Sequence, residues 1–446
     1  MPYLTDTIAA LATDHLAASA IAIIRMSGDQ AYAILTGLWH RPMDFVPGMM
    51  THGFIVDPAD GRQVDEVMAV VFRGPRSYTG QDMVEIDCHG GLLVSERILA
   101  LCLGQGARMA ERGEFTRRAF LNGKMDLPQA EGVADIIDAD TPQRIQLAME
   151  GLTGQVTALI DPLRRRIMDV LAHIEVNIDY PEYDDDTGTV TAGEVAPLLD
   201  GWLADCDAML SAAESAQIIK EGITTVIVGR PNVGKSSLLN ALLGRDKAIV
   251  TPIAGTTRDL VEGDVHLDGL TLHLVDTAGL HQAGDDIERI GIARSRQALA
   301  AAQLVIVVLD GSAPLDDADR QLLADTAARP RIVVYNKQDL ASGPLPLGIS
   351  ARDGDIGPLV TAIKRMFARH QVALRQPTLT NRRQIGLLMQ ARTAMAQAAA
   401  GLKAGATVDL IADDLQTAYG RLGEIGGAGA GEELMDAVFQ RFCVGK

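Results

Sequence analysis

A chain of 446 residues is too long for one hydrophobic core, so we expect roughly two to four domains. Apolar residues make up 47% and charged residues 22% of the composition, which fits a globular protein and argues against long disordered regions. The formal net charge of −18 disfavours non-specific binding to nucleic acid or membranes. Any contact with nucleic acid must therefore come from local basic patches.

The cysteines and the N-terminal residues indicate the compartment. The chain has four cysteines, Cys88, Cys102, Cys206 and Cys443. None form a CxxC pair, and so large a chain does not need a disulfide framework. Asp6 and Asp14 lie where a signal peptide would be apolar, and the apolar run at 16–24 is too short to cross a bilayer. We expect a cytoplasmic protein without a membrane segment.

Residues 1–120 mix strand-like runs with short helical segments and glycine-rich turns. The runs at 21–24, 67–72 and 83–86 are rich in β-branched and apolar residues, which is typical of strands. We predict that this stretch forms one compact α/β domain.

Two helical blocks, 121–220 and 374–446, flank a block at 221–373 in which strands and helices alternate. Apolar residues recur every three or four positions in both flanking blocks, which indicates amphipathic helices, and Gly154 and Pro162 are expected to interrupt the first. The alternating block predicts a parallel α/β sheet. We infer that it is inserted into one helical domain whose halves pack together; two separate helical domains are the alternative.

A phosphate-binding loop is the first motif of the α/β block. The strand-like run 224–228 leads into GRPNVGKS at Gly229 to Ser236, and a helix-like run follows to residue 243. This is GxxxxGK[ST] in its strand–loop–helix context, where glycines turn backbone N–H groups toward phosphate oxygens and the helix N-terminus adds positive potential. Lys235 would reach the β- and γ-phosphates, and the Ser236 hydroxyl would ligate Mg²⁺. The candidate contacts are Asn232, Val233, Gly234, Lys235, Ser236 and Ser237.

Three further motifs indicate that the bound nucleotide is GTP. After the strand-like run 272–275 comes the DTAG motif, whose candidate residues are Asp276, Thr277, Ala278 and Gly279. After the strand-like run 332–335 comes NKQD, with Asn336, Lys337 and Asp339. Ser350 and Ala351 follow, and their backbone would approach the guanine O6. An ionised Asp339 accepts hydrogen bonds only, so it matches the adjacent N1–H and N2–H donors of guanine and selects GTP over ATP. The order and spacing predict a GTP-hydrolysing enzyme.

The residue that activates water is less plain. Many small GTPases place a glutamine directly after DxxG, but Leu280 stands there and cannot polarise water. Glu288 is a candidate for orienting the water, and a solvated surface acid is the alternative. Asn232 and the loop 251–256 could also place a monovalent cation beside the phosphates, where it would neutralise developing charge.

The motifs together resemble one family, the bacterial MnmE (TrmE) tRNA-modification GTPases, over nearly the whole chain. The segments that carry the resemblance are DTIAA at 6–10, IIRMSG at 23–28, SYTG at 77–80, HGG at 89–91, GEFT at 113–116, RAFLNGK at 118–124, GTTRD at 255–259 and the terminal FCVGK at 442–446.

The resemblance implies an N-terminal α/β domain that binds folate and dimerises, an all-α helical domain, and an inserted P-loop (Ras-like) α/β G domain. It also implies a role in adding a carboxymethylaminomethyl or aminomethyl group at C5 of the wobble uridine of certain tRNAs. A homodimer, an FAD-dependent partner of the MnmG family, a tetrahydrofolate derivative and potassium-stimulated hydrolysis are implied with it.

The resemblance also assigns roles by position. The implied potassium ligands are Asn232, Thr251, Ile253 and Thr256. Ser236 and Thr257 would hold magnesium, and Thr251, Thr256 and Thr257 would also meet GTP. Glu288 matches the glutamate that orients water in the family, and Cys443 matches its functionally required cysteine. The implied folate contacts are Arg25, Glu85, Lys124 and Lys446.

Three departures from the family pattern put parts of this assignment in question. Residues 14–19 replace a usual glycine-rich loop, which affects the shape of the expected folate pocket. Arg112 replaces a usual proline, and His281 replaces a usual arginine and would introduce pH sensitivity there.

Other functions fit some of the same motifs. A GTP-switched factor for ribosome or RNA assembly is the main alternative, and a structural scaffold with an idle nucleotide site is a third. Basic residues that could meet tRNA are Arg117, Arg118, Arg164, Arg165, Arg166, Arg382 and Arg383. Each also fits a solvated or intramolecular ion pair.

Overall fold

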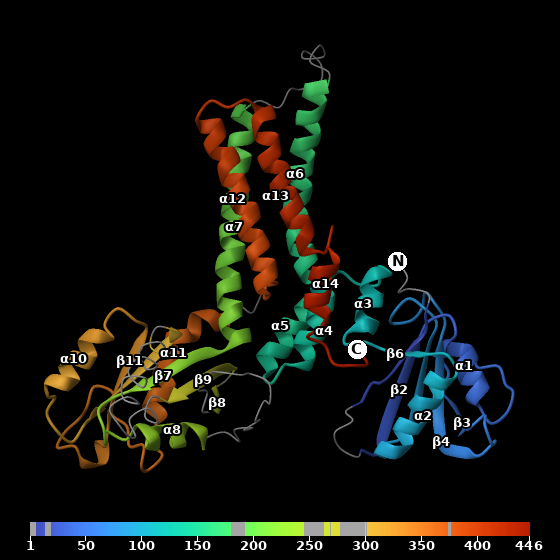
Figure 1. Ribbon diagram of the computed structural model, residues 1–446. Coiled ribbons are helices and arrows are strands. Elements are labelled where there is room, and N and C mark those ends of the chain that lie inside the picture. Colours follow the sequence, from blue (N-terminus) through green and yellow to red (C-terminus); the bar gives the residue numbers. More distant parts are fainter. Residues whose placement is uncertain are drawn as a thin grey trace, which may run out of the picture. The chain divides into compact units, whose positions relative to one another are not determined.

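The computed structural model describes residues 6–13, 19–179, 192–244, 263–267, 269–276, 299, 301–372 and 376–446. The chain divides into two compact units (Figure 1). The first combines Met1–Asp138, Ala148–Leu199 and Gln390–Lys446, and the second combines Ala139–Leu147 and Asp200–Met389. One unit thus contains both ends of the chain while the other is built mainly from its middle, as expected for an insertion. The finer predicted boundaries at residues 120, 220 and 373 stay a prediction.

The first unit contains a six-stranded sheet of order β3-β4-β5-β2-β1-β6. Its strands are β1 (Ile8–Leu11), β2 (Ile21–Ser27), β3 (Thr51–Val56), β4 (Gln63–Phe72), β5 (Met83–His89) and β6 (Arg108–Met109). Neighbouring strands are antiparallel except β1 and β6, which run parallel. The strands expected at 21–24, 67–72 and 83–86 lie within β2, β4 and β5, so these expectations are confirmed.

The two faces of this sheet have different partners. Helices α1 (Ala31–Leu38) and α2 (Leu92–Gly104) share a buried core with Ile24 and Ile86 on one face. Because side chains alternate along a strand, Arg25 and Glu85 extend from the opposite face. Phe115 of α3 (Glu114–Leu121) packs on that face in a separate cluster with β1.

The two flanking blocks form α4 (Leu127–Ile137), α5 (Pro142–Leu152), α6 (Gln155–Asp179), α7 (Ala192–Glu221), α12 (Arg382–Lys403), α13 (Val408–Ile425) and α14 (Glu432–Phe439). Within the first unit, Leu127 of α4 shares a buried cluster with Met435 and Phe439 of α14. The long helices α6 and α13 contact each other (Figure 1). Between them, the Arg164 guanidinium lies 4.5 Å from the centre of the Tyr419 ring. The inserted arrangement is therefore confirmed, and the alternative of two separate helical domains is wrong.

One of the two expected helix interruptions is wrong. Gly154 adopts a left-handed φ of 78° between α5 and α6, as expected. Pro162, however, lies inside α6, which continues to Asp179. Leu163 and Ile167 are fully buried on α6. The burial of this apolar stripe offsets the hydrogen bond that a proline cannot donate.

The second unit contains a five-stranded sheet of order β11-β10-β7-β9-β8. Its strands are β7 (Ile223–Val228), β8 (Gly263–Leu267), β9 (Leu270–Asp276), β10 (Leu304–Asp310) and β11 (Arg331–Asn336). All neighbours are parallel except β8 and β9. Side chains of α8 (Lys235–Leu243) and α11 (Gly357–Val372) share a core with one face, and those of α10 (Asp317–Asp325) share a core with the other. The carboxyl ends of parallel strands meet at one edge, so the loops that carry the motifs lie together there.

Among the residues that the structure describes, no helix has the length and apolarity needed to cross a membrane.

Candidate functional site

The phosphate loop is a tight turn between β7 and α8. An added Cβ at Gly229 would lie 2.5 Å from the Val308 carbonyl oxygen, and at Gly234 it would lie 2.2 Å from Asn336 Nδ2. Gly234 has φ +94° and Asn232 has φ 62°, in the left-handed region that glycine and asparagine tolerate best. Lys235 Nζ donates to the carbonyl oxygens of Gly229 (3.0 Å) and Arg230 (2.8 Å). The lysine thus lies folded over the loop that the sequence predicts will hold phosphate.

Asn336 joins the phosphate loop to the loop expected to recognise the base. It ends β11 and is only 3% exposed. Its Nδ2 donates to the Val233 carbonyl oxygen at 2.8 Å, and its Oδ1 accepts from the Ala351 N–H at 3.0 Å. Both polar ends of one buried amide are therefore used to hold two predicted motifs in register.

Asp339 and Ser350 are also brought together. Ser350 Oγ lies 3.0 Å from Asp339 Oδ1 and 2.7 Å from Asp353 Oδ2, and Asp339 is exposed on the turn η4 (Gln338–Leu340). A hydroxyl has one proton, so the two carboxylates compete for it. Asp353 was not among the predicted residues.

Lys337 has a partner that sequence reasoning missed. Its backbone has φ 64°, and its Nζ lies 2.5 Å from Asp310 Oδ2 at the end of β10. Burial would raise the pKa of the Asp310 carboxyl, but hydrogen bonds from Lys337 and Ser312 outweigh it and hold the pKa below its usual value. The signal that could have found Asp310 was its position at the carboxyl end of a central parallel strand.

The remaining predicted residues of this site are placed only in part. Ser236 and Ser237 are exposed in the first turn of α8, and Asp276 ends β9, where it pairs in register with Ile227 of β7. Outside the described residues lie Thr251, Ile253, Thr256, Thr257, Thr277, Ala278, Gly279, Leu280, His281 and Glu288.

A second cluster of predicted residues lies on the first unit. Arg25 and Glu85 are register partners on β2 and β5, and the Arg25 Nη2 to Glu85 Oε1 distance is 2.7 Å. Arg25 Nη1 also donates to the Gly445 carbonyl oxygen at 3.0 Å, which brings the C-terminal residues to the sheet. Burial, and then the charge of Arg25, lower the pKa of the Lys446 ammonium group.

Lys124 and Cys443 are placed differently. Lys124 Nζ donates to the Pro75 carbonyl oxygen at 2.9 Å, which links this lysine to the 75–80 loop. Cys443 is exposed, whereas the other three cysteines are buried. The Cys443 carbonyl oxygen accepts from the Gly113 N–H at 3.4 Å, and Val444 forms a backbone bridge with Arg112. The arginine that departs from the family pattern thus holds the C-terminal segment through its backbone.

Several arginines that could meet tRNA have intramolecular partners. Arg118 is 2% exposed and pairs with Asp6 and Glu114. Arg117 pairs with Asp436 at 3.0 Å, and Arg382 forms two hydrogen bonds to the Glu221 carboxylate. The prediction of intramolecular ion pairs is confirmed for these three arginines.

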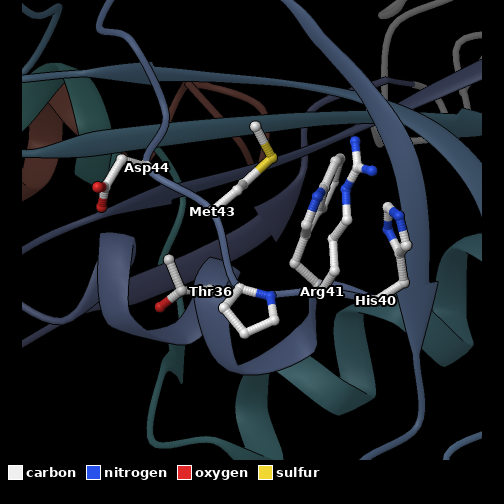
Figure 2. A pocket seen from close by; sticks show the side chains of 7 residues that line it. Thr36, His40, Arg41, Met43 and Asp44 are labelled. Carbon is white, nitrogen blue, oxygen red and sulfur yellow. The ribbon is translucent and has the colours of Figure 1, made fainter.

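An open hollow of about 500 Å³ lies directly after α1 (Figure 2). It is lined by Thr36, Trp39, His40, Arg41, Pro42, Met43 and Asp44. His40 Nδ1 accepts from the Phe54 N–H at 3.1 Å, which ties the segment to β3. None of the predicted site residues lines this hollow.

Comparison with known proteins decides the family. The protein-family model for the GTP-binding protein TrmE N-terminus matches residues 7–124, and the family model for the MnmE helical domain matches residues 127–443. The tRNA modification GTPase MnmE of Lactobacillus delbrueckii subsp. bulgaricus is 46% identical over 456 residues, covering 99% of this chain and 98% of the relative. This chain belongs to the MnmE family of tRNA modification GTPases. The resemblance inferred from the sequence motifs is confirmed.

A second relative has the same name, and two solved structures resemble parts of the chain. The MnmE of Geobacillus kaustophilus is 45% identical over 465 residues, covering 99% of each chain. Aquifex aeolicus Era bound to GDP and AlF4⁻ is 26% identical, covers 39% of this chain and 67% of its own, and has a TM-score of 0.26. The G domain of the Thermotoga maritima FeoB is 27% identical, covers 33% of this chain and 98% of its own, and has a TM-score of 0.25.

Proposed function

We propose that this MnmE-family protein hydrolyses GTP to drive modification of tRNA at C5 of the wobble uridine, by a carboxymethylaminomethyl or aminomethyl group. We further propose that it acts in the cytoplasm as a homodimer with an FAD-dependent partner of the MnmG family. The observation that carries the nucleotide part is the Asn336 amide, which holds the phosphate loop at Val233 and the base loop at Ala351. An assembly factor for ribosomes or RNA would share this G domain but not the N-terminal and helical regions matched to TrmE and MnmE.

The residues present fit a guanine nucleotide. The backbone at Gly229 and Gly234 leaves no room for a Cβ, which is the form of a cradle that brings N–H groups close to phosphate. Lys235 at the start of α8 supplies positive charge at the helix N-terminus. The exposed Asp339 carboxylate would accept from N1–H and N2–H of guanine, while Ser350 and Ala351 close the base loop.

The donor set also fits hard cations, which prefer oxygen ligands. Ser236 would contribute a hydroxyl to Mg²⁺ together with Thr257. Asn232, with its left-handed backbone at the loop tip, would offer an amide oxygen to K⁺, together with Thr251, Ile253 and Thr256. When bound, the cations would neutralise charge that develops on the phosphates during hydrolysis. Glu288 would orient the attacking water in place of the glutamine that Leu280 replaces.

The first unit would bind a tetrahydrofolate derivative. Arg25 and Lys446 would meet its carboxylates, and Glu85 would accept from the pterin edge, since these three lie on one side of the sheet. Lys124 would contribute from the 75–80 loop. Cys443 lies exposed beside this cluster and would take part in the chemistry on the one-carbon unit.

The test combines purified protein with cells. Potassium is expected to raise the GTP hydrolysis rate over sodium, and Glu288→Ala should lower it about a hundredfold or more because the water loses its orienting group. In a deletion strain, mass spectrometry of tRNA nucleosides should show the C5 modification restored by the wild type but not by Glu288→Ala.

Asp325→Ala serves as the control, because it removes an exposed acid at the end of α10 in the same unit. Equal rates in potassium and sodium, or full activity of Glu288→Ala, would contradict the hydrolysis mechanism. If the deletion strain kept the C5 modification of its wobble uridines at the wild-type level, the role in tRNA modification would be contradicted.

A further inference from the structure

We propose that Arg230, the second residue of the phosphate loop, is a positioning residue for GTP, held in place by Asp316 and Asp319 at the start of α10. This inference rests on the proposed function and deepens it, because it identifies a device that acts on the loop without touching the nucleotide.

The geometry divides the oxygens of the two aspartates between two tasks. Asp316 Oδ1 accepts from the Asp319 N–H at 2.9 Å, and Asp319 Oδ2 accepts from the Asp316 N–H at 3.3 Å, which forms the N-terminal cap of α10. The other oxygen of each carboxylate meets Arg230. Asp319 Oδ1 lies 3.1 Å from Arg230 Nε, and Asp316 Oδ2 contacts Arg230 Nη1. One guanidinium therefore completes the pairing of both capping residues.

The Asp319 carboxylate is buried, so it depends on the positive charge of Arg230. Asp319 is 1% exposed, so its charge is removed from water. The Nε to Oδ1 contact lacks hydrogen-bond geometry and is electrostatic in character. A buried carboxylate deprived of its cation is strongly destabilised, so the start of α10 holds the Arg230 side chain firmly. The side chain is thereby directed to α10 rather than to the phosphates.

The backbone around Arg230 needs such an anchor. The loop has a glycine at each end, where the backbone rotates most freely. Pro231 fixes its own φ, and Asn232 is held in the left-handed region, which is costly for a residue other than glycine. The Arg230 carbonyl oxygen accepts from Lys235 Nζ, and the neighbouring Gly229 lies against the Val308 carbonyl oxygen. An anchor at the side chain of Arg230 therefore fixes the loop before the nucleotide arrives, which lowers the cost of ordering it on binding.

The same stretch of chain also holds the base loop. Asp310, at the other end of the β10–α10 connection, pairs with Lys337, and the Gly311 N–H donates to the Asn336 carbonyl oxygen at 2.7 Å. The segment from Asp310 to Asp319 thus contacts the base loop through its first residue and the phosphate loop through its last residue.

A direct contact between Arg230 and phosphate is the competing explanation, and the aspartates separate the two. If Arg230 bound phosphate, Asp319→Asn would release it and leave affinity unchanged or raise it. If Arg230 positions the loop, Asp319→Asn must weaken binding as Arg230→Met does. Asparagine retains an oxygen for the helix cap, so this variant removes the charge while the cap persists.

The experiment measures GTP and GDP affinity, KM, kcat and the nucleotide-free melting temperature for Arg230→Met, Asp319→Asn and the double variant. Each single variant should bind nucleotide about tenfold less tightly than the wild type. The double variant should bind as tightly as the single variant with the lower affinity, because both substitutions break the same contact. KM should rise by a larger factor than kcat falls. Arg320→Met is the matched control, since Arg320 is an exposed arginine of α10 paired with Asp317 at 2.7 Å.

Affinity of Arg230→Met equal to that of the control, additive losses in the double variant, or unchanged or tighter binding by Asp319→Asn would overturn the proposal. Should Arg230→Met not fold, Arg230→Lys retains the charge and is expected to show a smaller loss in the same titration; a loss as large as for Asp319→Asn would count against it. Failure of the wild type to bind GTP would instead overturn the proposed function.

Discussion

At the scale of single residues, the site depends on positions where the backbone conformation and the close neighbours admit only one residue type. Gly234 combines a left-handed φ with a neighbour, Asn336 Nδ2, that an added Cβ would approach to 2.2 Å. Asn336 cannot move away freely, because both ends of its buried amide are hydrogen-bonded. The phosphate loop and the base loop therefore share one point of contact that tolerates no extra atom.

Gly234→Ala tests this contact. We expect GTP affinity to fall about tenfold or more, because alanine is strained at this φ and displaces Asn336. Gly343→Ala is the control, since nothing lies within 4 Å of the added Cβ there. Nucleotide titration checks the prediction, and a Gly234→Ala protein that binds GTP like the control would refute it.

At the same scale, the sequence motifs predicted which residues would gather but not how they hold one another. The spacing indicated that Asn336, Asp339, Ser350 and the phosphate loop would meet, and the described residues do meet. The ion pairs of Arg230 and Lys337 were missed, because Asp319 and Asp310 belong to no motif and their partners lie on other elements. Such contacts depend on side-chain packing in three dimensions, which spacing along the chain does not encode.

At the scale of elements, apolar runs next to glycine-rich loops predicted strands reliably. Runs at 224–228, 272–275 and 332–335 lie within β7, β9 and β11, whose apolar side chains contribute to cores on both faces of the sheet. The prediction failed at Pro162, where packing of α6 outweighed local preference. The hairpin of β8 and β9 was not predicted beyond its second strand.

That hairpin is joined to the end of α7 by a histidine. His273 Nδ1 lies 2.6 Å from Asp264 Oδ1, and His273 Nε2 lies 2.7 Å from the Glu221 carbonyl oxygen. With an acceptor at each nitrogen, only the protonated ring can donate at both. The hydrogen bond with Asp264 accordingly raises the pKa of His273, and the same bond lowers the pKa of Asp264.

We predict a pH-dependent stability from this pair. Because the folded-state pKa of His273 lies above its unfolded value, the stabilisation is complete below the unfolded pKa and is lost as pH rises through the folded pKa. At acidic pH it is lost as Asp264 is protonated, since the folded-state pKa of that group lies below its unfolded value. His273→Gln should therefore lower the unfolding free energy by on the order of 1 kcal/mol near pH 6, where the partly exposed pair is charged, and by less near pH 8.

Denaturant unfolding at the two pH values measures the difference. His266→Gln is the control, because His266 lies on the neighbouring strand and its Nδ1 lies 3.2 Å from the uncharged Thr271 hydroxyl. The same loss at both pH values for His273→Gln would contradict the assignment of a charged pair.

At the scale of the whole molecule, the first unit is closed by residues from opposite ends of the sequence. Arg25 and Gly445 are hydrogen-bonded although 420 positions separate them. The insertion could be predicted, because the helical period stops and returns around the α/β block. Periodicity could not predict the docking of the C-terminal segment on the β-sheet, because the docking depends on backbone contacts at Gly113, Arg112 and Val444. Only the family resemblance, which placed Lys446 in one implied site with residues of the sheet, indicated it.

Gly445 leaves no room for a side chain where the C-terminal segment docks. Its φ is +96°, and an added Cβ would lie 2.8 Å from both the Ala12 Cα and the Leu11 carbonyl oxygen at the end of β1. Neither neighbour is a flexible side chain, so alanine at this position must displace the segment. The carbonyl oxygen that Arg25 uses would move with it, and Cys443 and Lys446 would leave the sheet.

Gly445→Ala should therefore accelerate amide hydrogen exchange about tenfold in peptides covering 108–114 and 441–446, because local opening becomes cheaper by roughly 1.4 kcal/mol. Exchange in the second unit should stay unchanged, since the substitution lies outside it. Gly420→Ala in α13 is the control, because an added Cβ there meets nothing within 4 Å and alanine favours the helix. Exchange in both peptides equal to that of the control would show that the C-terminal segment is held by other contacts, and the cluster of Arg25, Glu85 and Lys446 would then not depend on Gly445.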